Sequence, residues 1–258
     1  MKKTNHNKAK LSVIALTLVA CLAVAGVAAY FTDADTTTNT FTVGKVSLDL
    51  QEPNWVGDIT GDSKDITPNQ EIAKDPQIKN DGVNDEFVFT TVAVPYANIK
   101  TAAQDGTVNA EATNTELYTL LDADGAEGIN DGWILMGYLN DNEEVSDTVV
   151  YRTDGTVVHL YAYGSETEMT ALAKDATTAP VFSKVRFCNA VEDQALEGEE
   201  KEITINAYGI QTTNINDNVG AGNADGKVAP SDVWAVVHNA NPSTAQAVAE
   251  DAVTDEKE

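Results

Sequence analysis

Cysteine is scarce in this chain. Among its 258 residues there are two, Cys21 and Cys188. Small secreted domains without a sufficient hydrophobic core depend on several disulfides, and two cysteines cannot supply that framework. Once Cys21 leaves with the export signal described below, Cys188 has no partner within the chain. We therefore expect packing or assembly to stabilise the protein. Cys188 remains open to three interpretations: a half-buried thiol, an intermolecular disulfide or a catalytic thiol.

Basic residues are also few. The chain has 16 Lys and Arg against 41 Asp and Glu, a formal charge of −25. Four of the lysines precede residue 11, so residues 30–258 keep 12 basic residues against 41 acidic ones, a formal charge of −29. Nucleic-acid binding needs basic patches, and this balance argues against it. A surface this acidic favours solubility and can attract divalent cations.

The sequence also has few histidines and none of the common catalytic motifs. The three histidines are His6, His159 and His238. The sequence contains no His-Glu-x-x-His pair, no Gly-x-Ser-x-Gly elbow and no phosphate-binding glycine loop. We therefore expect no catalytic site and no zinc site, and we interpret His159 and His238 as structural.

Three acidic turns raise the question of calcium. Residues 223–232 match part of an EF-hand loop, with Gly226 at its sixth position. Ala221 stands at the first position, where it cannot bind a cation. The other two turns, 58–62 and 122–125, are shorter. Asx turns explain all three, so no cofactor is predicted and calcium is kept as the alternative.

The first 29 residues have the layout of a secretory signal peptide. Lysines precede the apolar run 11–27, and small residues stand at −3 and −1 before a predicted cleavage between Ala29 and Tyr30. We expect the mature protein to be secreted, in the extracellular matrix or at the cell surface, and to meet the membrane only during export.

Two alternatives to cleavage after Ala29 stay open. Residues 18–21 fit a lipoprotein cleavage box, which would make Cys21 a lipidated N-terminus. Residues 11–30 are also long enough to span a bilayer as an uncleaved anchor, because about 20 apolar residues suffice.

The remaining sequence is typical of strands and turns, because runs rich in Val, Thr, Ile and Tyr alternate with Asn, Asp and Gly. The run 87–96 is apolar on both faces and predicts a central strand covered on both sides. Asp154 and Gly155 predict a tight hairpin. The other strands are predicted at 41–50 (with a bulge at 44–45), 71–80, 133–139, 149–151, 156–160, 181–188 and 203–207.

Three short helices are predicted between these strands. Capping boxes begin at Thr113 and Ser165, each with a Glu three residues later and apolar residues behind it. The third helix covers 230–238.

The predicted fold class is mainly β: a single antiparallel, jelly-roll-like β-sandwich with short inserted helices. It covers residues 41–239. A flexible N-terminal segment, 30–40, precedes it, and a disordered acidic tail, 240–258, follows it.

With these residues in view, the chain resembles the camelysin/TasA family of secreted Gram-positive surface and biofilm-matrix proteins. Four stretches carry the resemblance: 30–33 (Tyr-Phe-Thr-Asp), 39–48, 74–82 and 203–211. The resemblance implies a jelly-roll fold, a dedicated signal peptidase of the SipW type, and self-association into extracellular fibres. It also implies a metallopeptidase label, for which this sequence offers none of the usual zinc ligands.

The same resemblance implies that an N-terminal segment of one subunit completes the sheet of the next. The residues that would carry this role are Tyr30, Phe31, Asp33, Phe41 and Val43. A polar, Thr-rich segment leading into an apolar strand can pair with an exposed sheet edge, and head-to-tail addition produces open filaments. The alternative is a frayed terminus beside the first strand of its own domain.

A second function stays open beside the fibre role. On the same fold, exposed aromatic side chains could make a monomeric surface module that binds a glycan or a host ligand. The residues considered are Trp55, Trp133, Tyr138 and Tyr163. The alternative for each is that it fills the core.

Overall fold

The structure is a computed structural model. It describes residues 46–55, 64–103, 105–191, 196, 199–213, 228–239 and 246–248. All of them belong to the second of the chain's two compact units, Gly44–Glu258. The predicted cleavage site, the segment 30–40, Phe41, Val43 and the bulge at 44–45 lie outside the described residues.

The described part of the chain is mainly β, as predicted. Its strands are β1 (Leu48–Gln51), β2 (Glu71–Ala73), β3 (Gln77–Asn80), β4 (Glu86–Ile99), β5 (Thr113–Glu116), β6 (Tyr118–Leu121), β7 (Trp133–Leu139), β8 (Val145–Ser146), β9 (Thr156–Ser165), β10 (Glu168–Met169), β11 (Lys184–Phe187), β12 (Thr204–Gln211) and β13 (Gln246–Val248). One helix, α3 (Pro230–Asn239), stands between β12 and β13.

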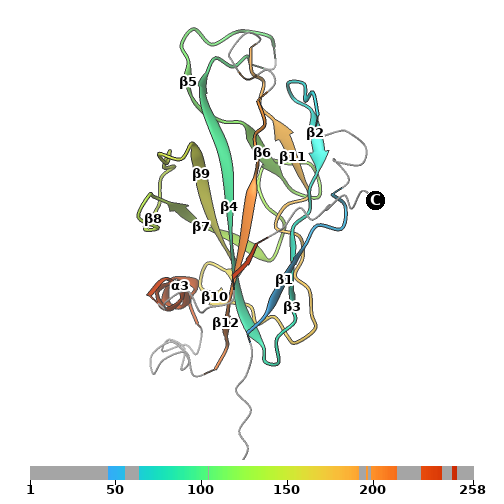
Figure 1. Cartoon of the computed structure of the whole chain (residues 1–258), viewed down its shortest axis with the longest axis vertical. Helices are drawn as coiled ribbons and strands as arrows, with labels where there is room; N and C mark the ends of the chain where they lie inside the picture. Colours follow the sequence, from blue (N-terminus) through green and yellow to red (C-terminus); the bar gives the residue numbers. More distant parts are fainter. Residues whose placement is uncertain are drawn as a thin grey trace, which may run out of the picture. The chain divides into compact units, whose positions relative to one another are not determined.

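The larger sheet has the antiparallel order β13-β12-β4-β9-β7-β8, with β5 and β10 paired to β4 and β9. Figure 1 shows β4 running along the middle of this sheet. Successive residues of a strand point to opposite faces. Val88 and Val92 accordingly enter one apolar core, whereas Phe87 and Phe89 enter another. The prediction of a central strand covered on both sides is confirmed.

A second layer covers one face of this sheet. Its strands are β2-β11-β6 and the pair β1-β3. Backbone hydrogen bonds from Val181 to Pro76 and from Asn80 to Ala176 join the two groups, so the segment leading into β11 runs beside β3. Ile78 and Val185 from this layer share a core with residues of β4 and β12. The antiparallel sandwich is therefore confirmed, and the jelly-roll connection order stays a prediction.

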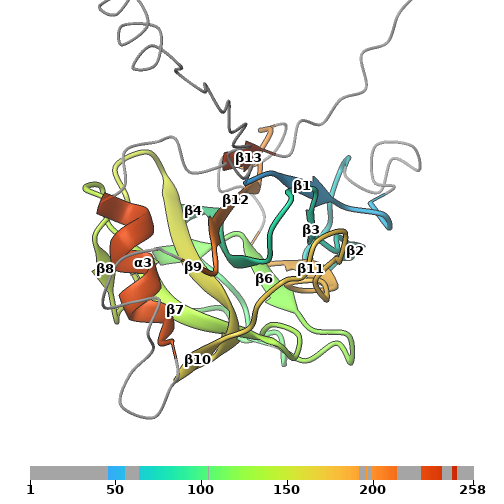
Figure 2. The same ribbon diagram turned by 90° about the horizontal axis from the view of Figure 1, so that it is seen from below.

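Helix α3 covers the opposite face of the larger sheet (Figure 2). It begins at Pro230, whose fixed φ suits a first helical position, and Asp232 lies in its first turn near the positive end of the helix dipole. Val233 and Trp234 are buried, and the Trp234 ring lies 5.2 Å from the ring of Phe89. The third predicted helix is confirmed.

The other two predicted helices are wrong. Residues 113–121 form β5 and β6, because the alternating threonines of β5 pair with the end of β4 and leave Glu116 free to meet His159. At the second box, the hydroxyl of Ser165 does accept a hydrogen bond from the backbone N–H of Glu168 at 3.1 Å. That contact closes the turn between β9 and β10 instead of starting a helix.

The predicted strand 149–151 is also absent, although the turn beside it forms. The N–H of Arg152 donates to the carbonyl of Thr156 at 2.9 Å, and Gly155 takes a φ of 86°. Of the predicted tail 240–258, the described part is β13, which pairs with β12. Within the described residues, no helix has the length and apolar character needed to cross a membrane.

Candidate functional site

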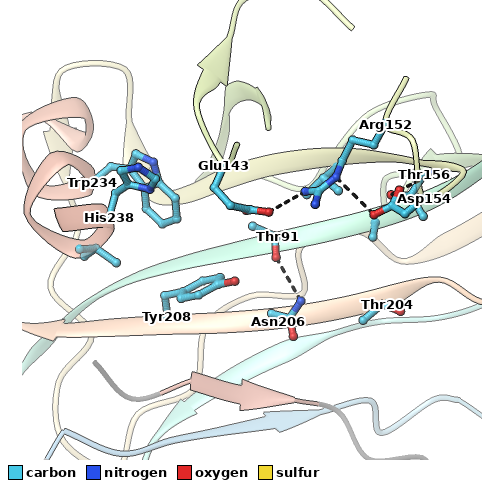
Figure 3. Close-up of a pocket in the computed structure, with 13 residues that line it drawn as sticks. Thr91, Glu143, Arg152, Asp154, Thr156, Thr204, Asn206, Tyr208, Trp234 and His238 are labelled. Carbon is cyan, nitrogen blue, oxygen red and sulfur yellow. Dashed lines mark hydrogen bonds and ion pairs between the residues drawn. The ribbon is translucent and has the colours of Figure 1, made fainter. Parts of the chain in front are cut away.

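A pocket of about 590 Å³ lies between helix α3 and the face of the larger sheet. Strands β4, β9 and β12 form its floor, and the segment between β8 and β9 closes one side (Figure 3). Its two ends differ in chemistry.

One end of the pocket is aromatic. Trp234 from α3 and Tyr208 from β12 meet edge to face, with ring centroids 5.7 Å apart, and His238 lies one helical turn beyond Trp234. Trp234 is buried and packs on Phe89, whereas Tyr208 is half-buried. Burial raises the pKa of the Tyr208 hydroxyl. The edge-to-face packing fixes the Tyr208 ring at the pocket wall.

The other end of the pocket is charged. The guanidinium of Arg152 lies with its Nη1 2.8 Å from Glu143 and its Nε 3.3 Å from Asp154 and 3.8 Å from Asp141. The Arg152 side chain is 16% exposed, and its Nε has no well-aligned hydrogen bond despite the nearby carboxylates. Carboxylates therefore outnumber the guanidinium here, and the local charge is negative.

Between these ends the floor is uncharged and combines polar side chains with the apolar Ala93 and Val158. The side chains of Thr204, Asn206 and Tyr208 follow one another along β12 at every second residue, so they share one face of the sheet. Thr91 of β4 stands opposite Asn206 in register, and the Asn206 amide donates to its hydroxyl at 3.4 Å. Thr156 adds a further hydroxyl, which donates to Asp154 at 2.7 Å.

The histidines do not join into a metal site. Nε2 of His159 lies 2.7 Å from a carboxylate oxygen of Glu116, and Nδ1 lies 3.2 Å from the hydroxyl of Tyr161. His238 is on α3 at the pocket. Among the residues that the structure describes, no group of three or more His, Cys, Asp and Glu could hold a metal ion.

The aromatic residues that the sequence offered for ligand binding lie elsewhere. Trp133 is buried and its Nε1 donates to the carbonyl of Ala179 at 2.9 Å, so its role as an exposed binding residue is wrong. Tyr163 packs on Trp133, and Tyr138 packs on His159; both are half-buried. Trp55 is half-buried beneath the ammonium of Lys74, 4.6 Å from its ring centroid.

Lys74 and Asp75, which belong to one of the stretches that resemble the camelysin/TasA family, hold the chain just after β1. The ammonium of Lys74 lies 2.8 Å from Glu52, and each of these side chains is 10% exposed. The carboxylate of Asp75 accepts hydrogen bonds from the backbone N–H of Asn54 at 2.9 Å and from its side-chain amide at 2.7 Å. This stretch therefore fixes the exit of the first strand.

Cys188 is half-buried just after β11, and burial raises the pKa of its thiol. Of the three acidic turns, 122–125 lies fully within the described residues. There the Asp122 carboxylate accepts the backbone N–H groups of Asp124 and Ala126, which makes an Asx turn. The other two turns, 58–62 and most of 223–232, lie outside the described residues.

Comparison with known families places part of the chain: residues 5–125, just under half of it, match the family described as camelysin metallo-endopeptidase. The match confirms the camelysin resemblance over that part of the chain. The chain has no match among curated proteins or among solved structures.

Proposed function

We propose that this chain, which carries the camelysin-family sequence over residues 5–125, is an exported structural subunit of extracellular or biofilm-matrix fibres on a Gram-positive cell surface. A SipW-type signal peptidase would release it at Ala29, and an N-terminal segment that includes Tyr30, Phe31, Asp33, Phe41 and Val43 would join subunits by strand addition.

The position of β1 supports this proposal. β1 follows the N-terminal segment directly, and among the described strands it forms a ladder with β3 alone. A strand bonded on one side exposes unpaired backbone groups, which are a template for pairing with another chain. Because the strand entering the fold is an edge strand, the segment before it can leave its own domain without breaking a central ladder.

The proposal makes the protein a structural subunit, although its family is named for a metallo-endopeptidase. His159 uses both ring nitrogens in contacts with Glu116 and Tyr161, so it offers no free ligand atom. A peptidase of this kind needs several histidine or carboxylate ligands around one metal.

Self-association of the mature chain, residues 30–258, tests the fibre role. Sedimentation velocity across a range of salt concentration, pH and calcium should show large assemblies under at least one condition. A protein that stays monomeric under all of them would contradict the proposal.

The pocket beneath α3 favours one alternative, a monomeric surface module that binds a glycan or a host ligand. Saturable retention of monomers on a polysaccharide would support this alternative. Self-association and ligand binding are measured in separate experiments, so a negative result in one contradicts only the proposal that it tests.

A further inference from the structure

We propose that the pocket between α3 and the larger sheet binds a neutral saccharide of one or two sugar units. The site differs from the aromatic residues that the sequence suggested. It does not depend on whether the subunits polymerise.

The size and shape of the pocket suit such a ligand. Its volume, about 590 Å³, lies within the range of about 300–1,000 Å³ usual for small-molecule sites. The half-buried Tyr208 lines one end, where it packs edge to face on Trp234. The C–H face of a sugar ring is apolar and can pack on an aromatic ring, while its hydroxyls point outward.

The floor provides partners for those hydroxyls. On this face of β12, Thr204 is exposed and Asn206 is half-buried, and the Asn206 amide also donates to the buried hydroxyl of Thr91 opposite it on β4. A threonine hydroxyl can both donate and accept, and an asparagine amide offers both a carbonyl oxygen and an NH₂ group. Sugar hydroxyls have the same dual character, so those that face the floor can pair with Thr204 or Asn206. An apolar ligand lying on the floor would cover the exposed Thr204 hydroxyl without offering it a partner.

The charge of the pocket selects against an anion. Arg152 already lies within 4 Å of three carboxylates, from Asp141, Glu143 and Asp154. An acidic ligand would have to displace one of them and would meet repulsion from the other two. The acidic balance of the whole chain adds to this repulsion. A neutral sugar has no such penalty.

Titration calorimetry on residues 30–258 tests the proposal. The probes are glucose, galactose, N-acetylglucosamine, maltose and cellobiose, with galacturonate as the anionic counterpart of galactose. At least one neutral probe should bind saturably, with a Kd of about 1 mM or below. Galacturonate should bind more weakly than galactose. No saturable binding of any probe up to about 20 mM would overturn the proposal, as would a preference for galacturonate.

Variants then locate the binding. Thr204→Val keeps the shape of the side chain and removes one exposed hydroxyl from the floor, so it should weaken binding by about fivefold. Thr115→Val is the matched control, because it makes the same change on β5, outside the pocket, and should leave the Kd unchanged. Tyr208→Ala should abolish binding while circular dichroism stays that of the folded protein. Equal affinity in all three variants would overturn the assignment of the site.

Discussion

The carboxylate of Glu86 holds the start of the first strand, because it accepts a hydrogen bond from the backbone N–H of Ser47 at 3.2 Å. Glu86 is fully buried, and its second oxygen has no partner among the described residues. Gly209 makes the space: a Cβ there would lie 2.9 Å from that oxygen and 3.0 Å from Leu48. Burial raises the pKa of Glu86 to about 7, and the N–H of Ser47 lowers it by less.

This buried carboxyl predicts that stability falls as pH rises. The folded pKa, about 7, exceeds the unfolded value, 4.5, so the folded state binds the proton more tightly. The stabilisation is fully present below pH 4.5 and is lost progressively up to about pH 7, by at most about 3 kcal/mol. Urea unfolding of Glu86→Gln at several pH values should show no such fall in the free energy of unfolding.

Glu111→Gln is the control for that experiment, because Glu111 is exposed. It should keep the pH dependence of the unmodified protein. If Glu86→Gln kept the full fall in stability between pH 4.5 and 7, another group would be responsible.

A second prediction concerns the buried pair Lys74–Glu52. Lys74→Met should lower the free energy of unfolding by about 3 kcal/mol, because Glu52 would stay buried without its partner. The double variant Lys74→Met with Glu52→Gln should be more stable than Lys74→Met alone, because it also removes the buried charge of Glu52. Lys184→Met is the comparison: Lys184 lies 3.0 Å from Glu71, but both side chains are at least 40% exposed. Its loss should cost no more than about 1 kcal/mol. Equal losses of unfolding free energy in Lys74→Met and Lys184→Met would contradict this prediction.

Two glycines with nearly the same φ allow the cost of backbone strain to be measured separately from the cost of a steric clash. Gly137 has a φ of 140° and Gly128 a φ of 139°, so alanine is strained at both. A Cβ at Gly137 would lie 2.6 Å from the carbonyl oxygen of Ser146, whereas a Cβ at Gly128 would have no neighbour within 4 Å. Gly137→Ala should therefore cost about 1–3 kcal/mol more than Gly128→Ala and should loosen β8. Thermal melts and amide exchange at Ser146 measure both effects, and equal melting temperatures would refute the prediction.

Cys188 should react slowly in the folded protein. Burial raises the pKa of its thiol and restricts access, so little thiolate is available at neutral pH. A chromogenic disulfide reagent should label it slowly under native conditions and fast in denaturant. Rapid native labelling, or a disulfide-linked dimer on a non-reducing gel, would show that the thiol is accessible.

Residue alternation predicted much of the fold. The pattern of β4 indicated a strand covered on both faces, because its odd and even positions are both apolar. In β12, Thr204 and Asn206 alternate with the apolar Ile205 and Ala207, and the face that carries Thr204 and Asn206 is part of the pocket floor. Local signals failed where tertiary pairing competed with them. The capping boxes at Thr113 and Ser165 have the hydrogen-bonding residues of helix starts, but neighbouring strands pair with both segments.

The pocket itself could not be predicted from the sequence. Its lining comes from four separate regions, near residues 91, 143–158, 204–208 and 234–238, and only the fold brings them together. Trp234 lies within the predicted helix 230–238, and Tyr208 directly follows the predicted strand 203–207. The aromatics chosen instead, such as Trp133, stand in equally apolar surroundings. Sequence alone could not distinguish a pocket wall from a core.

The central claim is that the N-terminal segment joins subunits into fibres. Negative-stain electron microscopy of residues 30–258, beside a chain that begins at Phe41, tests it most directly. The account predicts filaments from the longer protein and single particles from the shorter one. Single particles from both would contradict the fibre role, and filaments from both would contradict the role of the segment before Phe41.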